Sequence, residues 1–252
     1  MGSLPEKIEL FHLLFLDQFG RKTDKNLYAL KGGCNLRFFM KSVRYSEDIG
    51  LDVHTIGKET LANKVDRILA SAPFQAVLAH QGLAIGEVTK PKQTETVQRW
   101  KLSINDSEGG FPARTRLEFS RRRFDEGVAF ESIDPVLARR YRIHPPLVNH
   151  YSLRTAFSQK VEALLSRTET QGRDVFDLDL LLRSGATAGD LPPGLRSKAG
   201  QAVDRALSIS FADFKAQVWA FLEPEYQSQY DSAPLWEGMV HRLADALTVG
   251  VG

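Results

Sequence analysis

Hydrophobic and polar residues follow two different periods in the first half of the chain. Apolar residues recur at helical spacing up to residue 19, and Ser3 with Glu6 forms a possible capping box at the start of this helix. Short apolar runs that end in glycine or polar residues predict strands between the helices. The predicted order is helix, strand, helix, strand, helix, at residues 3–19, 27–33, 34–40, 46–53 and 58–72.

The pattern changes near residue 150. Two β-rich runs, residues 96–105 and 114–124, are joined by a turn-rich segment, 106–113. The prolines of "HPPLVNH" (144–150) then mark a plausible boundary. Beyond it the chain predicts helix after helix, at residues 153–167, 173–183, 210–222 and 235–247. We therefore expect an α/β domain over residues 1–146 and a helical domain over residues 147–252.

Composition narrows the class of protein. An apolar fraction of 42% and a charged fraction of 25% in 252 residues are ordinary for a globular protein of one large or two modest domains. The net charge of +2 means that any preference for nucleic acid must come from local clusters of basic residues. The single cysteine, Cys34, excludes an internal disulfide and a cysteine-rich metal site. No apolar run approaches the roughly 20 residues of a membrane span and no signal peptide is evident, so a cytoplasmic protein is expected.

A diglycine, Gly32 and Gly33, lies between the first predicted strand and the next helix. Backbone amides at such a turn can approach phosphate oxygens closely, although most diglycines are merely tight turns. Ser46 and Asp48 on the following strand strengthen the phosphate-binding interpretation. The order strand, diglycine, helix, strand with acidic residues is typical of nucleotidyltransferases.

On these residues the chain resembles a known family. "LKGGCNLRFF" followed by "VRYSEDIGLDV" is similar to the AbiEii/AbiGii toxin family, whose pattern is a diglycine, a small residue and a leucine, then Arg-x-Ser-x-Asp-Ile-Asp-Leu. Further similar segments occur in the family's order up to about residue 182: "QRWKLSI", "TRLEFSRR", "HYS", "QKVEALLSR" and "GRDVFDL". The resemblance implies a nucleotidyltransferase-type α/β (α+β) domain with a mixed sheet, followed by a helical domain.

The resemblance also implies an activity and partners. It implies a toxin of an abortive-infection or type IV toxin–antitoxin system, with a cognate antitoxin. The implied reaction is the transfer of a nucleoside monophosphate from an NTP to an RNA end, with tRNA as the expected acceptor, and it requires Mg²⁺ or Mn²⁺. No membrane is involved.

Site residues follow from the matching positions. The implied catalytic positions are Asp48, Gly50, Lys160, Asp174 and Asp177. The implied nucleotide-binding residues are Gly32, Gly33, Ser46, Lys160, Arg167 and Arg173, and the implied metal ligands are Asp48 and Glu118. We expect Gly33, Ser46, Asp48, Lys160 and Asp177 to converge on one cleft.

Gly50 departs from the family pattern, which has its second aspartate there. Acids at alternate strand positions lie about 6.6 Å apart and can share metal ions, whereas Asp48 and Asp52 are about 13 Å apart on the same face. Asp52 is therefore one step too far to replace the missing acid. The change has two open origins, a deliberate inactivation or a natural loss, and the intact flanking pattern favours the first. The chain is accordingly an impaired enzyme or, alternatively, a non-catalytic nucleotide- or RNA-binding protein.

Several of these motifs also have plain structural interpretations. Lys160 and Arg167 are seven residues apart and can be solvated charges on one helix face, while Arg173 and Asp177 can form an intrahelical ion pair. Because "VFDLDLLL" is expected to be buried, at least one of Asp174 and Asp177 should need a partner in either case.

The arginine-rich run "RTRLEFSRRR" (114–123) is either a solvated sheet edge or a track for a polynucleotide, with Trp100 and Phe124 nearby as core residues or base-stacking platforms. Cys34 is expected to be a small buried side chain, because no histidine lies near it in the sequence.

Overall fold

The computed structural model describes residues 2–106, 109–124 and 126–248, and the chain forms two compact units. The first unit comprises Met1–Phe39 and Tyr45–Tyr151, and the second comprises Met40–Arg44 and Ser152–Gly252. Two residues of the predicted turn segment, 107 and 108, lie outside the described residues.

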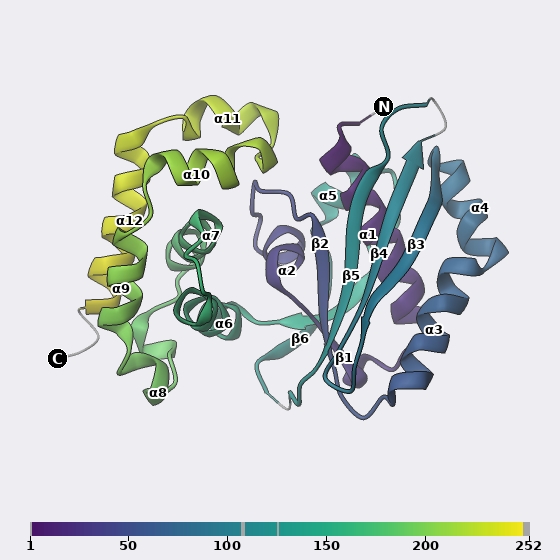
Figure 1. Ribbon diagram of the computed structural model, residues 1–252, viewed down its shortest axis with the longest axis horizontal. Coiled ribbons are helices and arrows are strands. Elements are labelled where there is room, and N and C mark those ends of the chain that lie inside the picture. The colour runs from purple at the N-terminus through teal and green to yellow at the C-terminus, as the bar shows by residue number, and fades with distance from the viewer. Residues whose placement is uncertain (1, 107–108, 125, 249–252) are drawn as a thin grey trace. The chain divides into compact units, whose positions relative to one another are not determined.

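A seven-stranded mixed sheet organises the first unit, with strand order β3-β4-β5-β2-β1-β7-β6 (Figure 1). Strands β2 and β5 pair in parallel, as do β1 and β7, and the remaining neighbours are antiparallel. The expected mixed sheet is confirmed, and the predicted strands at 46–53 and 114–124 are direct neighbours. The strands are β1 (Tyr28–Lys31), β2 (Asp48–Val53), β3 (Leu83–Gln93), β4 (Val97–Asp106), β5 (Ala113–Arg121), β6 (Val128–Ser132) and β7 (Leu147–Tyr151).

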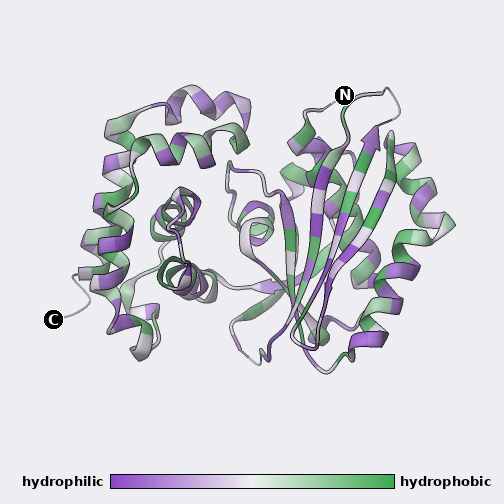
Figure 2. Cartoon of the chain, viewed as in Figure 1, coloured by the Kyte–Doolittle hydropathy of each residue, from purple (hydrophilic) through white to green (hydrophobic). Residues whose placement is uncertain are grey.

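Helices cover one face of this sheet. The long first helix packs on it through a row of phenylalanines, and Phe19 contacts Phe119 of β5 with ring centroids 5.4 Å apart. Hydropathy alternates along β4 and β5 (Figure 2), and burial alternates with it, because successive side chains in a strand point to opposite faces. The helices of this unit are α1 (Leu4–Arg21), α2 (Gly32–Phe39), α3 (Lys58–Ala70), α4 (Ala72–His80) and α5 (Pro135–Arg140), with a short 3₁₀ turn at Lys25–Leu27.

The opposite side of β1, β2, β4 and β5 is polar, and we call it the polar face. It is defined by the side chains of Lys31, Asp48, Asp52, Arg99, Arg116 and Glu118 together with Gly50.

The segment 144–150, predicted as an interruption, leads into a strand. Leu147–Tyr151 forms β7, which pairs with both β1 and β6. Proline is tolerated immediately before a strand, where its missing N–H does not break the ladder, so Pro145 and Pro146 do not end the domain. The first unit accordingly extends to Tyr151.

Helices make up most of the second unit. The segment 210–222, predicted as one helix, is broken at Val218, whose backbone departs from helical geometry, into α10 (Phe211–Gln217) and a 3₁₀ turn (Trp219–Phe221). Residues 40–44 join this unit because Arg44 bridges to Leu222 and Glu223 donates its N–H to the Val43 carbonyl at 2.9 Å. The other helices are α6 (Leu153–Ser166), α7 (Gly172–Arg183), α8 (Pro193–Arg196), α9 (Ala199–Leu207), α11 (Pro224–Tyr230) and α12 (Ala233–Thr248), with a 3₁₀ turn at Ala188–Asp190.

Candidate functional site

Gly50 lies in a row of four residues that crosses the polar face. It is paired with Lys31 of β1 on one side and with Glu118 of β5 on the other, and Glu118 is paired in turn with Arg99 of β4. Arg99 donates to the Glu118 carboxylate from Nε at 2.8 Å and from Nη2 at 2.5 Å. The position without a side chain is therefore flanked by one ammonium and one carboxylate.

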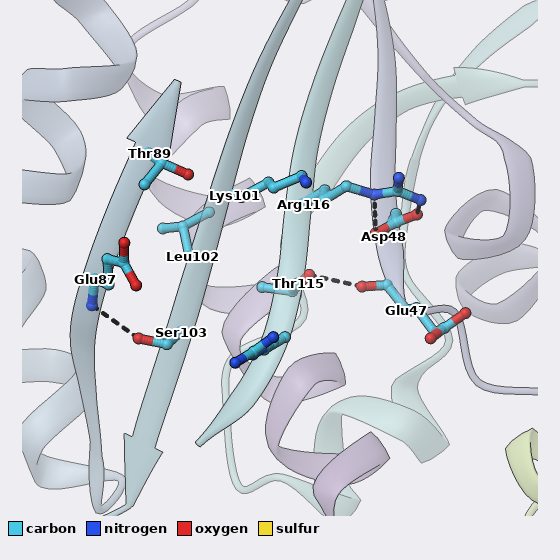
Figure 3. A pocket seen from close by; sticks show the side chains of 10 residues that line it. Glu47, Asp48, Glu87, Thr89, Lys101, Leu102, Ser103, Thr115 and Arg116 are labelled. Atoms are coloured by element: carbon cyan, nitrogen blue, oxygen red, sulfur yellow. Dashed lines mark hydrogen bonds and ion pairs between the residues drawn. The ribbon is translucent and has the colours of Figure 1, made fainter. Parts of the chain in front are cut away.

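Asp48, the predicted first metal ligand, is held by a guanidinium. Arg116 is its register partner on β5, and its Nε donates to Oδ1 of Asp48 at 2.8 Å while Nη2 donates to Oδ2 (Figure 3). Bidentate pairs of this kind are among the stronger protein hydrogen bonds, and this one raises the pKa of Arg116. Both carboxylate oxygens of Asp48 thus have a partner.

Of the residues predicted to bind phosphate, the diglycine lies at the start of α2 and Ser46 lies just before β2. Gly32 has a φ of +70°, a conformation that favours glycine, and it begins the helix directly after β1. Ser46 directs its hydroxyl to the backbone carbonyl of Asp48 at 2.8 Å. This hydrogen bond holds the backbone just before β2.

Asp52 occupies the far end of the polar face and is completely buried. Lys31 Nζ lies 2.5 Å from its Oδ1, and the Tyr151 hydroxyl donates to Oδ2 at 2.8 Å. Both oxygens are occupied, so Asp52 does not take over the role of the acid missing at position 50.

A cavity of about 410 Å³ opens beside Asp48 over strands β3, β4 and β5. Its lining mixes basic and acidic side chains, and Figure 3 shows Asp48 and Arg116 at one side and Glu87 with Ser103 at the other. The cavity has room for a polar ligand next to the predicted metal ligand.

The second unit holds a buried charge network on α6 and α7. Lys160 Nζ lies 2.5 Å from Oδ2 of Asp177 and 3.5 Å from Oδ1 of Asp174. Arg44 donates to both oxygens of Asp177, and Arg167 Nε donates to Asp174 at 2.5 Å. Both aspartates are completely buried and each is paired with two cations, as expected for buried acids.

Electrostatics in this network favour the charged carboxylate. Burial alone would raise the pKa of Asp177, but the positive charges of Arg44 and Lys160 outweigh burial and lower that pKa below its usual value. Burial, together with nearby Arg167, lowers the pKa of Arg173. Lys160 and Arg167 are therefore not simply solvated surface charges, and the partners of Asp177 are Arg44 and Lys160, not the Arg173 of the intrahelical alternative.

The predicted site residues fall into two sets. Gly32, Gly33, Ser46, Asp48, Gly50 and Glu118 belong to the first unit, and Lys160, Arg167, Arg173, Asp174 and Asp177 belong to the second. Each unit brings its own set together, and convergence of the two sets on one cleft stays a prediction.

Metal binding also stays a prediction, and the few carboxylates near Asp48 limit the number of ions that could bind. Among the described residues, no three His, Cys, Asp or Glu side chains gather as a metal site. Asp48 and Glu118 lie on adjacent strands, one register step apart, and both are paired with arginines. Two carboxylates plus substrate phosphates suit one Mg²⁺ ion, provided that Arg116 releases Asp48.

Three subsidiary expectations have structural outcomes. Trp100 is fully buried and donates to Asp66, and Phe124 is buried against Tyr151, so both are core residues and not base-stacking platforms. Cys34 is buried as expected, but His12 of α1 lies beside it, with Nδ1 3.5 Å from Sγ. Burial, partly offset by Asp48, lowers the pKa of His12 to about 3, so this histidine stays neutral.

Four cations of these sites were not among the predicted site residues: Lys31, Arg44, Arg99 and Arg116. Three of them had a signal in the sequence, because Lys31 precedes the diglycine, Arg44 begins the Arg-x-Ser-x-Asp pattern and Arg116 lies in the arginine-rich run. The pairings of the three arginines depend on contacts between distant segments, such as the 133 residues that separate Arg44 from Asp177.

Comparisons with known proteins show which family model and which solved structures this chain matches. The family model described as "Nucleotidyl transferase AbiEii toxin, Type IV TA system" matches residues 14–246. MenT4, a nucleotidyltransferase toxin from Mycobacterium tuberculosis H37Rv, is similar in structure with a TM-score of 0.71 and 18% identity, covering 97% of this chain and 84% of MenT4.

Two structures from Helicobacter pylori share the fold as well. JHP933 has a TM-score of 0.65 at 17% identity over 100% of this chain and 93% of its own. A protein whose title reads "putative nucleotidyltransferase" has a TM-score of 0.62 at 17% identity over 98% and 93%. A search of curated proteins found no match.

The chain belongs to the AbiEii family of nucleotidyltransferase toxins of type IV toxin–antitoxin systems. A family of toxin–antitoxin pairs indicates an antitoxin as partner. Across the described part of the chain, each helix is too short or too polar to cross a membrane.

Proposed function

We propose that this chain's site is built for metal-dependent transfer of a nucleoside monophosphate from an NTP to an RNA end, with tRNA as the expected acceptor, and that Gly50 impairs the transfer. The supporting observation is the row Arg99, Glu118, Gly50, Lys31 beside Asp48. Asp48, Gly50 and Glu118, the positions that we match to the family's acids, share one sheet face near the glycine start of α2.

Binding of the nucleotide would begin at the diglycine. The N–H groups at the start of α2 have no partner within the helix and point toward incoming phosphate oxygens. Within the second unit, the buried Asp174 and Asp177 hold Arg167 and Lys160, the side chains that the family resemblance assigns to the nucleotide, in fixed positions. Phosphoryl transfer depends mainly on such positioning and on charge neutralisation.

Asp48 and Glu118 would hold a divalent cation, which neutralises developing charge on the phosphates when bound. For Asp48 to do so, Arg116 must turn away from it, and a triphosphate offers the guanidinium an alternative anion. Release of Arg116 by the nucleotide would thus make the carboxylate available only when substrate is present.

Gly50 removes one carboxylate from this arrangement. Position 50 itself carries no acid, and both oxygens of Asp52 are already paired, one with Lys31 and one with Tyr151. The carboxylate that would help to activate the attacking hydroxyl of the acceptor is therefore missing. Nucleotide binding is expected to persist while transfer is slow.

A second candidate function is nucleotide or RNA binding without chemistry. The observation that favours it is that both predicted metal ligands are paired with arginines, Asp48 with Arg116 and Glu118 with Arg99. A binding protein of this family would retain the diglycine and the basic residues and would need no free carboxylate.

One experiment separates the two functions. The chain and its Gly50→Asp variant are incubated with each α-labelled NTP, Mg²⁺ and total RNA. Transfer predicts strong labelling by Gly50→Asp, weak labelling by the unchanged chain, and none after a further Asp48→Asn substitution. Nucleotide binding without labelled RNA from any variant would establish the binding protein instead.

A further inference from the structure

Lys31 crosses the empty position left by Gly50. The two residues are register partners in the β1–β2 ladder. A Cβ built at position 50 would lie 3.4 Å from both Cγ and Cε of Lys31. The aliphatic stem of Lys31 therefore lies over the glycine. If position 50 carried an aspartate, its side chain would contact this stem.

The ammonium of Lys31 is held by a buried anchor. Asp52 is completely buried, and its second oxygen is taken by the Tyr151 hydroxyl at 2.8 Å. The Lys31 side chain itself keeps 20% of its surface exposed on the polar face. A lysine that is fixed at its tip by a rigid carboxylate, yet reachable from outside, presents the remaining N–H donors of its ammonium in a fixed position.

We propose that Lys31 is a nucleotide-binding residue whose fixed charge replaces one divalent cation at this site. The inference rests on the proposed function and deepens it. With Asp48 and Glu118 as its carboxylates, the site takes up an NTP with one cation, and Lys31 contacts the triphosphate where an acid at position 50 would bring a second cation. Asp52 is the positioning residue for Lys31.

Charge balance supports this assignment. A site for a triphosphate needs several positive charges close together, whether metal ions or side chains supply them. An acid at position 50 would have added a ligand for metal and would have lain against the Lys31 stem. Without that acid, Glu118 is the one carboxylate in the row, and Lys31 is the positive group next to Gly50.

The test counts metal ions and measures affinity without any reaction. The full-length chain is titrated with Mn²⁺ and the α,β-methylene analogues of the four NTPs, which cannot transfer, and free Mn²⁺ is followed by electron paramagnetic resonance. We expect one Mn²⁺ per bound analogue in the unchanged chain and two in Gly50→Asp. Lys31→Met should weaken analogue binding by about tenfold or more, the loss expected for a charge-assisted hydrogen bond, and Lys31→Arg should retain most of it.

Controls separate binding from folding. Lys25→Met removes the same charge from an exposed lysine six residues earlier and should leave analogue affinity unchanged. Because Lys31→Met leaves buried Asp52 without its cation, the variant Lys31→Met with Asp52→Asn serves as the second test and should bind the analogue as weakly. Two Mn²⁺ ions in the unchanged chain, or full affinity in both Lys31→Met variants, would overturn the inference.

The same variants distinguish this inference from the proposed transfer. Lys31-dependent binding of one Mn²⁺ with no labelled RNA from Gly50→Asp would sink the transfer and support the inference. Labelled RNA from Gly50→Asp, with analogue binding that is indifferent to Lys31, would do the reverse.

Discussion

Glu118 lies directly beside Gly50 in the parallel pairing of β5 with β2. A side chain at position 50 would therefore stand between the Glu118 carboxylate and the Lys31 stem, on the same face as Asp48. An aspartate at position 50 would thus give this face three neighbouring carboxylates, with Asp48 and Glu118 as the other two.

Gly50→Asp is expected to restore nucleotide transfer to RNA and, in a bacterial host, toxicity. The new Cβ meets only the flexible Lys31 stem, at 3.4 Å, so the fold should accept it. Gly50→Asn fits the same space but brings no negative charge to a cation, so it should stay inactive. Incorporation of labelled nucleotide, paired with growth after induction, measures both effects. Equal labelling by the unchanged chain and Gly50→Asp would mean that another group already fills the role.

Arg116→Met should increase the affinity of the nucleotide-free chain for Mn²⁺. The guanidinium now competes with any cation for both oxygens of Asp48, and methionine keeps much of its bulk without its charge. We expect a severalfold lower Mn²⁺ dissociation constant by calorimetry, together with weaker NTP binding. Arg122→Met, at an exposed arginine just beyond β5, is the control. Unchanged Mn²⁺ affinity would show that Arg116 does not compete with a cation for Asp48.

Asp177→Asn should be strongly destabilising, by about 3–5 kcal/mol, because Arg44 and Lys160 would then face a buried neutral amide. Lys160→Met should lower the free energy of unfolding less, since Asp177 keeps Arg44 and Asp174 keeps Arg167. The same substitution in the Gly50→Asp protein should abolish nucleotide transfer. Urea unfolding gives the free energies.

The pH dependence of unfolding gives a second check on Asp177. Its folded pKa is lowered, so its contribution is present above the usual value near pH 4 and is lost as the pH falls through the folded value. In Asp177→Asn the free energy of unfolding should not show this decrease at low pH. The same decrease in both proteins would contradict a charged Asp177 in the network.

His12 should make the protein less stable as the pH falls below about 6.5. The folded state holds the pKa of His12 at about 3, whereas the unfolded chain binds the proton near pH 6.5. Between these values the unfolded state binds more protons, so the free energy of unfolding decreases as the pH is lowered. His12→Gln should flatten the slope between pH 6.5 and 4, measured by urea unfolding at several pH values. A slope equal to that of the unchanged chain would mean that His12 is protonated in the folded state.

Local elements of the fold were predictable where the pattern of a few residues determines them. The alternation in "SEDIGLDV" correctly placed Asp48, Gly50 and Asp52 on one face of a strand, because side-chain direction in a strand depends only on the residue's place in the sequence. β3 was missed because it is mostly exposed and lacks a clear apolar alternation. β7 was missed because prolines directly precede it.

Partners of charged residues were beyond the sequence. That the acids of α7 would need partners followed from their apolar neighbours, yet Arg44 lies 133 residues from Asp177 and could be identified only in the folded chain. The same holds for Arg116 with Asp48, 68 residues apart.

The sequence by itself determined the class of protein, the strand and helix that carry the diglycine, and the absence of an acid at position 50. Tertiary structure alone decided what surrounds that position: Glu118 from β5, Lys31 from β1, and the buried Asp52 that anchors Lys31. The physical reason is that periodicity and turn chemistry act over a few residues, whereas strand order and register depend on the packing of the whole sheet.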